Sequence, residues 1–270
     1  MYEHIVVPSN GTADSQRAMT MGSDLARVFD AELVVVTASP VDDDGSLNVL
    51  KATAMAKSDA TRTVWIEPEP SMPTALSTVT SFRPKSLICM VSGGGGGVKQ
   101  AMAGSPVERV LRQTDAPIVV VGPEWNGAVV SSVRHLVICV DGSATAEAAI
   151  PLAATWARQL GLDTTVVHVH TDPGASPVDL DRLARTVAWS SDTSHTVTVD
   201  SSSAVDGVLD LVEATPAPLV VVATKSLTGL DRLLHRSFTA DLARRCAVPL
   251  LVRRGPLPVV TPSWIEPSGS

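Results

Sequence analysis

Short apolar runs rich in β-branched residues alternate along this chain with stretches that have helical periodicity. Such runs, bounded by turn residues, are typical of buried strands. Strands that alternate with helices form β-α-β units with parallel strands and right-handed crossovers. The sequence therefore predicts an α/β fold with strands at residues 5–8, 32–38, 63–66, 86–90 and 117–121, and again at 136–140, 164–170, 195–199, 219–223 and 249–252.

The second set of runs repeats the first at a nearly constant distance. Asn10 matches Asp141 at an offset of 131 positions, and Pro117 matches Pro249 at an offset of 132. An offset that holds over half of the chain indicates duplication of a complete domain rather than a solenoid repeat. We therefore expect two tandem doubly wound domains, each with a parallel sheet flanked by helices, at residues 1–122 and 133–254.

Two segments fall outside this pattern. Residues 122–127 are turn-rich and short, which predicts a tight linker between the halves. Residues 255–270 form a proline-rich tail that cannot make a regular helix, so we expect it either to be disordered or to lie extended across a neighbour. Trp264 and Ile265 favour the docked alternative.

The fifth strand of each half carries a Val- and Ile-rich edge. An exposed edge of this kind is an aggregation hazard. We therefore expect residues 118–121 and 250–252 to pair or abut in an intramolecular pseudo-dimer, and a homodimer of the whole chain remains open.

Composition narrows the functional classes. The net charge of −7 argues against sequence-independent binding to nucleic acid and against binding to an anionic membrane. The first residues lack a basic region and a long apolar stretch, so we expect neither a signal peptide nor a membrane span. Three scattered cysteines do not form a disulfide framework or a zinc site, and Cys89 and Cys139 are expected to be core residues. A cytoplasmic location fits.

Candidate chemistry first appears where each opening strand ends, at residues 8–12 and 139–143. Ligands of open parallel sheets bind beyond the carboxyl ends of the strands. Each segment has an Asx residue followed by glycine and a hydroxyl residue. The same pattern also makes a turn and a helix N-cap, so either role is open.

Five consecutive glycines, residues 93–97, follow the fourth strand. They expose backbone N–H groups that could approach a phosphate, but a glycine run is equally typical of a surface loop. Further on, Ser105 and Glu108 form a capping box with Pro106 at the first helical position. A helix N-terminus of this kind attracts anions, and its capping hydroxyl could face a phosphate.

The equivalent segment of the second half keeps only Gly229 as a glycine. Lys225, Arg232 and Arg236 in this segment could attract an anion or could simply form a solvated basic face. Enzyme motifs are weak throughout the chain. We expect His168 and His170 to face opposite sides of a strand and not to share a metal, and no nucleophile–base pair follows from spacing.

Together these segments resemble the universal stress protein family over residues 1–122 and 133–254, in the tandem arrangement of actinobacterial members. Residues 140–143 read V-D-G-S, residues 229–234 read G-L-D-R-L-L, and Pro117 and Pro249 open the closing strands, all as in that family. The resemblance rests on the order of these motifs and on the duplication of the domain.

The resemblance implies a five-stranded parallel sheet of order 3-2-1-4-5 in each half, with pairing of the halves through strand five. It also implies that the strand-one loop and the glycine loop hold ATP or AMP, with or without Mg²⁺. The candidate binding residues are Pro8, Ser9, Asn10, Val36, Gly94, Gly104, Ser105 and Pro106 in the first half, and Asp141 and Ser237 in the second.

The sequence departs from the family's ATP pattern, G-x-x-G, nine residues, then G-[ST]. In the first half Val91 replaces the leading glycine, and Asn10 replaces the strand-one acid. In the second half Ala223, Ser226 and Arg236 stand at the three glycine positions. Because the Arg236 side chain fills the approach to the backbone N–H groups, we expect nucleotide in the first half and little or none in the second.

Three functions compete. The leading hypothesis is a non-enzymatic, adenine-nucleotide-binding regulator of stress or dormancy. The second is a member that binds no nucleotide and acts as an interaction module for an unknown protein partner. The third is an adenylating or ATP-pyrophosphatase-type enzyme, but such enzymes carry S-G-G-x-D-[ST] after the first strand. Here Ser92-Gly93-Gly94 follows the fourth strand and lacks the acid.

Overall fold

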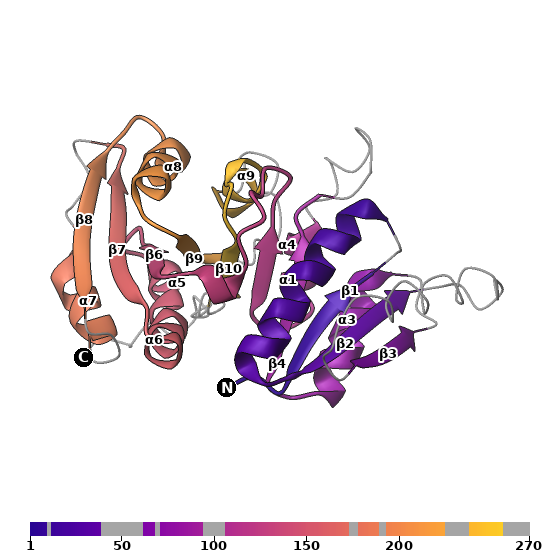
Figure 1. Cartoon of the computed structure of the whole chain (residues 1–270). Coiled ribbons are helices and arrows are strands. Elements are labelled where there is room, and N and C mark those ends of the chain that lie inside the picture. The colour runs from indigo at the N-terminus through magenta and orange to yellow at the C-terminus, as the bar shows by residue number, and fades with distance from the viewer. Residues whose placement is uncertain are drawn as a thin grey trace, which may run out of the picture.

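A computed structural model describes residues 1–9, 12–38, 62–67, 71–93, 106–172, 178–188, 193–224 and 238–255 (Figure 1). The first half contains β1 (His4–Pro8), α1 (Ala13–Phe29), β2 (Glu32–Ala38), β3 (Arg62–Glu67), α3 (Met72–Phe82), β4 (Ser86–Val91), α4 (Pro106–Leu111) and β5 (Ile118–Val121). The second half contains η2 (Val130–Ser132), β6 (His135–Cys139), α5 (Ala144–Glu147), α6 (Ala149–Leu160), β7 (Asp163–His170), α7 (Leu180–Ala188), β8 (Ser194–Asp200), α8 (Ala204–Ala214), β9 (Pro218–Thr224), α9 (Phe238–Arg245) and β10 (Leu250–Arg254).

The strands form one ten-stranded sheet in the order β3-β2-β1-β4-β5-β10-β9-β6-β7-β8. Neighbouring strands within each half are parallel. The exception is the central pair, β5 and β10, which is antiparallel and places Leu251 opposite Val119. The predicted strands are confirmed to within one or two residues at their ends, and so is the predicted contact between the two fifth strands.

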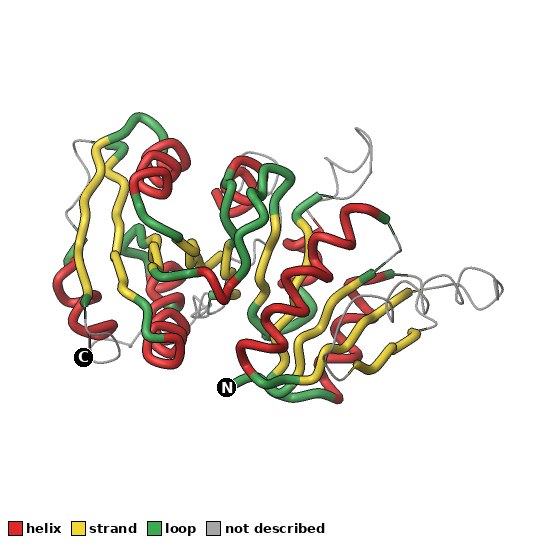
Figure 2. Tube along the Cα trace, viewed as in Figure 1, coloured by secondary structure: helices red, strands yellow, loops and turns green. Residues whose placement is uncertain are grey.

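Helices cover both faces of the sheet, as Figure 2 shows. Alternate residues of β1 reach the two faces: Ile5 and Val7 pack beneath α1, whereas Val6 packs on the side of α3 and α4. The face with α1 also carries α6 and α7, and the opposite face also carries α8 and α9. Burial of strand residues on both faces explains the continuous apolar runs in the sequence. The tail beyond residue 255 lies outside the described residues.

The linker and the short segment that follows it, including η2, are held to the first half, in part by a buried carboxylate. Asp24 of α1 is 5% exposed and accepts hydrogen bonds from the backbone N–H and the hydroxyl of Ser131, both at 2.8 Å. Arg27 adds an ion pair at 3.3 Å. Nearer the N-terminus of the same helix, the Arg17 guanidinium donates to the carbonyl of Pro123 at 3.0 Å. The linker is therefore tied along the length of α1.

We expect Asp24→Asn to lower the free energy of unfolding by about 1–2 kcal/mol, because the neutral amide loses the ion pair with Arg27 and replaces two charge-assisted hydrogen bonds to Ser131 with weaker ones. Urea denaturation measures the change. Asp210→Asn, at an exposed position of α8, is the matched control and should stay within about 0.5 kcal/mol of the parent. Equal stability of the two variants would contradict this account.

A three-ring aromatic cluster joins the two halves on the α1 face. Trp156 of α6 is fully buried, and its ring centroid lies 5.2 Å from Phe29 and 6.2 Å from Tyr2. Its indole N–H donates to the Tyr2 hydroxyl at 2.9 Å. Burial raises the pKa of Tyr2 to about 12, so the hydroxyl stays protonated. The halves therefore share a core as well as a sheet.

The cysteines are core residues, as expected for Cys89 and Cys139. All three thiols are buried, and burial raises the pKa of Cys89 and of Cys139. Cys89 donates to the carbonyl of Ala18 at 3.3 Å. A buried thiol with a raised pKa is a poor nucleophile, so these side chains contribute packing rather than chemistry.

Candidate functional site

The strand order places the topological switch point of the first half at the carboxyl ends of β1 and β4, where an open sheet is expected to bind a ligand. These two strands are neighbours, with Ile5 opposite Leu87. The helix that follows β1 packs on one face of the sheet, and the helix that follows β4 packs on the other. Where consecutive helices leave in opposite directions, an open sheet forms its ligand-binding crevice. The first candidate loop follows β1, and the glycine run follows β4.

The described ends of the loop after β1, Ser9 and Thr12, are held by hydrogen bonds. Ser9 N–H donates to the carbonyl of Val36 on β2 at 2.8 Å, and Pro8 stands opposite Val36 in the sheet. Thr12 caps α1 by accepting from Ser15 N–H at 3.4 Å, and the Ser15 hydroxyl donates to the carbonyl of Thr12 at 2.7 Å. The start of α1 is thereby fixed at the crevice.

Among the predicted residues of this loop, Pro8 and Ser9 lie at the strand end. The Val36 side chain is fully buried, and its backbone carbonyl accepts the hydrogen bond from Ser9 N–H. Asn10 lies outside the described residues.

On the other side of the crevice, β4 ends against the second half. Ser92 N–H donates to the carbonyl of Val121, and the Ser92 hydroxyl donates to the carbonyl of Ala243 in α9 at 3.1 Å. Val91, which replaces a family glycine, packs partly buried against the core beneath α1. The helix begins at Pro106, as predicted. Gly94, Gly104 and Ser105 lie outside the described residues.

The matching loop of the second half forms local hydrogen bonds. The Asp141 carboxylate accepts from Ser143 N–H at 2.9 Å, and Ser143 caps α5 by accepting from Ala146 N–H at 3.2 Å. Gly142 has a φ of 78°, which favours glycine. A Cβ at this position would meet a methyl group of Val178 at 3.0 Å, so Val178 approaches one side of the loop, while Asp141 and Gly142 themselves are exposed. Ser237 lies outside the described residues.

The expectation for His168 and His170 is wrong. Residues two apart on a strand point to the same face. The two ring centroids are indeed 6.3 Å apart. His168 Nδ1 donates to the carbonyl of Val140 at 3.1 Å, and His170 lies 3.2 Å from the carboxylate of Asp200. Within the described ranges, however, no group of three or more His, Cys, Asp or Glu side chains could hold a metal ion.

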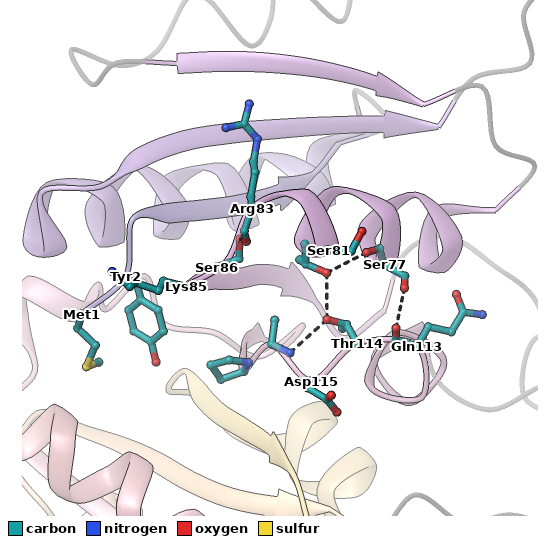
Figure 3. A pocket seen from close by; sticks show the side chains of 13 residues that line it. Met1, Tyr2, Ser77, Ser81, Arg83, Lys85, Ser86, Gln113, Thr114 and Asp115 are labelled. Atoms are coloured by element: carbon teal, nitrogen blue, oxygen red, sulfur yellow. Dashed lines mark hydrogen bonds between the residues drawn. The ribbon is translucent and has the colours of Figure 1, made fainter.

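A groove of about 500 Å³ opens at the opposite end of the strands, where the sequence predicted nothing (Figure 3). It lies before β1, β4 and β5. Its walls come from the end of α3, the α3–β4 turn and the α4–β5 turn, and include several hydroxyl side chains. No motif marks it, because its parts are separated in sequence and each is ordinary alone. Clustered Ser and Thr at residues 77–81 were the available signal.

In the part of the chain with described coordinates, no helix is long and apolar enough to cross a membrane.

Solved structures resemble this chain over nearly its whole length. A universal stress protein from Archaeoglobus fulgidus DSM 4304 covers 93% of this chain and 96% of its own, at 16% identity and a TM-score of 0.72. A functionally unknown protein from Pseudomonas aeruginosa PAO1 covers 94% and 93%, at 15% identity and a TM-score of 0.62. At these identities the likeness establishes the fold: a mostly parallel α/β sheet flanked by helices.

The model of the universal stress protein family matches residues 1–67 and 132–254. The unmatched stretch between them contains the glycine run, with its departures from the family pattern, and the linker. The matched residues make up more than half of the chain, and they include both opening strands and the whole second half. The chain belongs to the universal stress protein family.

Proposed function

We propose that this chain is a regulator of stress or dormancy that binds an adenine nucleotide, ATP or AMP, in its first half. The observation that carries the proposal is the topological switch point between β1 and β4, with the start of α1 fixed beside it. Backbone N–H groups at a helix start attract phosphate. The Ser9–Asn10 loop and the segment around Gly94, Gly104 and Ser105 would face the phosphates from the two sides.

The second half is proposed not to bind nucleotide. Val178 approaches its strand-one loop from one side, and its acid is engaged in a local turn. At the far side Arg236 stands where the first half has Gly104. The two halves therefore have different roles: one binds ligand, and the other completes the sheet. In this proposal residues 1–122 and 133–254 are tandem domains that form an intramolecular pseudo-dimer through β5 and β10, and the antiparallel pairing of those strands supports it.

A non-enzymatic interaction module is the second candidate function. Two substitutions at the crevice favour it. Asn10 accepts hydrogen bonds without the negative charge of the family's aspartate, and Val91 adds a side chain where the family has none. If binding has been lost, the same fold would serve recognition of a protein partner instead.

Calorimetric titration of ATP and of AMP into the full chain separates these functions. We expect saturable binding at one site per chain, and a loss of about tenfold or more, equivalent to about 1.4 kcal/mol, for Gly104→Arg. The substitution copies Arg236 into the first half. Ala214→Arg, which places the same side chain at an exposed position at the end of α8, is the matched control and should bind as the parent does.

Three results would reject the nucleotide proposal or its placement. Absence of saturable binding would favour the interaction module. Equal affinity of Gly104→Arg and the parent would show that the ligand does not bind at the glycine segment. Two nucleotides per chain would show that the second half binds despite Arg236.

A further inference from the structure

The centre of the sheet has a local two-fold relation. The antiparallel register of β5 and β10 places Val119 opposite Leu251. These two residues are also equivalent by the offset of 132 positions that relates the two closing strands. In a two-fold junction, a contact made from one side is repeated at the equivalent residues of the other side. The path of the chain after β5 therefore indicates the path of the chain after β10.

The linker shows how the chain leaves β5. Gly122 lies against the end of α9, where a Cβ would meet the carbonyl oxygens of Ala243 and Cys246 at 2.3 Å and 3.3 Å. Asn126 N–H then donates to the carbonyl of Ala247 at 2.9 Å. The linker thus crosses the turn between α9 and β10 before it reaches η2 and β6.

The chain after β10 begins in the same way. Arg254, which is equivalent to Gly122, lies 3.7 Å from the Asp115 carboxylate and donates to the carbonyl of Arg112 at 3.5 Å. Both partners belong to the turn between α4 and β5, and Asp115 lines the groove before β1, β4 and β5. Gly255 is buried and extends the pairing with β9 by one hydrogen bond of 3.0 Å. The tail therefore starts beside a wall of the groove.

We propose that residues 256–262 of the proline-rich tail dock in this groove, along the two-fold equivalent of the path of the linker. The offset of 132 makes Pro258 equivalent to Asn126 and makes Asp115 equivalent to Ala247. The contact between Asn126 and Ala247 therefore places Pro258 beside Asp115. The proposal rests on the tandem arrangement proposed above, but not on nucleotide binding.

The far end of the groove matches the end of this path. The linker leads to Ser132 and Val133 before β6, and the offset of 131 that relates the opening strands makes them equivalent to Met1 and Tyr2 before β1. Met1 and Tyr2 line the groove, and Figure 3 shows them together at one end of it. Met1 is 39% exposed, so it offers apolar surface to an occupant. A chain that runs from the end of β10 toward Met1 crosses the groove.

The groove suits an uncharged, extended segment. Its charged side chains are paired, Lys85 with Glu3, Arg83 with Glu32 at 3.0 Å, and Asp115 with Arg254. The hydroxyls of Ser77 and Ser81 already donate to backbone carbonyls. Residues 256–265 carry no charge, and their prolines favour an extended chain, which loses little conformational entropy on docking. The volume of about 500 Å³ lies within the range of about 300–1,000 Å³ that is usual for binding sites.

Disulfide trapping in the full chain tests the proposal. A disulfide requires Cα atoms within about 7 Å of each other, and the native cysteines are buried. In a glutathione buffer, Asp115→Cys with Pro258→Cys should form an intramolecular disulfide. Its effective concentration should exceed that of two control pairs by about tenfold or more. One control joins Asp115→Cys to Ser268→Cys, beyond the equivalent of the linker, and the other joins Pro258→Cys to Asp210→Cys on exposed α8.

Mass spectrometry of the unreduced, digested protein identifies each bond. Equal trapping of the three pairs would show that the tail has no preferred place, and would overturn the proposal. Disulfide-linked dimers through Asp115→Cys and Pro258→Cys would assign the groove to the tail of a second copy, and would overturn docking within one chain. Trapping is measured without nucleotide, so its failure leaves the proposed function untouched.

A second measurement does not depend on the geometry of a disulfide. Leu257 is equivalent to Trp125, which packs partly buried against the core. We expect Leu257→Asp to shift the amide resonances of residues 77–86 and 113–117, because burial of a carboxylate opposes docking. Gly269→Asp adds the same charge near the end of the sequence and should leave them unchanged. Unchanged resonances in Leu257→Asp, or equal changes in the two variants, would overturn the proposal.

Discussion

Trp156→Ala is expected to lower the free energy of unfolding by about 3–5 kcal/mol, the range for removing a large aromatic side chain from a packed core. The side chain is fully buried and touches Phe29 and Tyr2 of the first half. Its removal leaves a cavity between the halves and also deprives the Tyr2 hydroxyl of its donor. Urea denaturation, followed by circular dichroism, measures the loss.

Two further variants divide this effect into packing and hydrogen bonding. Trp156→Phe keeps a ring but removes the indole N–H. Combined with Tyr2→Phe in a double-mutant cycle, it should show a coupling of about 0.5–1.5 kcal/mol, the net value of one hydrogen bond. Trp125→Ala, in the partly buried linker, should cost less than Trp156→Ala. A loss below about 1 kcal/mol for Trp156→Ala would show that the cluster does not hold the halves together.

The largely exposed edge strand β8 was predictable from its β-branched residues, whereas most other strands were predictable because they are buried on both faces. Such strands become continuous β-branched runs, and all ten runs identified in the sequence are strands in the structure. The central pairing followed from the hazard of leaving two apolar edges exposed. A helix start was equally predictable where one residue determines it, as Pro106 does at the start of α4.

Contacts between distant residues were not predictable from pattern. The Tyr2–Trp156 hydrogen bond spans 154 positions, and nothing in either local sequence points to the other residue. The groove has the same origin, because Ser77 of α3 and Gln113, which lies beyond the end of α4, meet only in the folded chain. The error over His168 and His170 was different: the alternation of strand residues was applied to a spacing of two, which returns to the same face.

The candidate crevice was predictable in its position but not in its detail. The end of β1 and the end of β4 follow from the topology once the strands are assigned. That Val36 would contribute its carbonyl to Ser9 while its side chain is fully buried depends on sheet register, which the sequence does not reveal. The approach of Val178 to Gly142 likewise depends on the path of the chain before α7.

Gly122→Val is expected to lower the free energy of unfolding by about 3 kcal/mol, at the upper end of the cost of overpacking. Gly122 directly follows β5, and a Cβ there would lie 2.3 Å from the carbonyl oxygen of Ala243 and 3.3 Å from that of Cys246. Both neighbours are backbone atoms at the end of α9, so no side-chain rotation can relieve the contact. The helix must shift, or β5 and β10 must separate.

Gly93→Val is the matched control, because a Cβ at Gly93 meets no atom within 4 Å. Its stability should stay within about 0.5 kcal/mol of the parent in urea denaturation. A shift of α9 has a second consequence, because the Ala243 carbonyl also accepts from the Ser92 hydroxyl at the end of β4. Gly122→Val should therefore weaken ATP binding in the first half as well as stability. If the two valine variants were equally stable, α9 could move without a loss of stability. The contact between Gly122 and the end of α9 would then not hold the two halves in register.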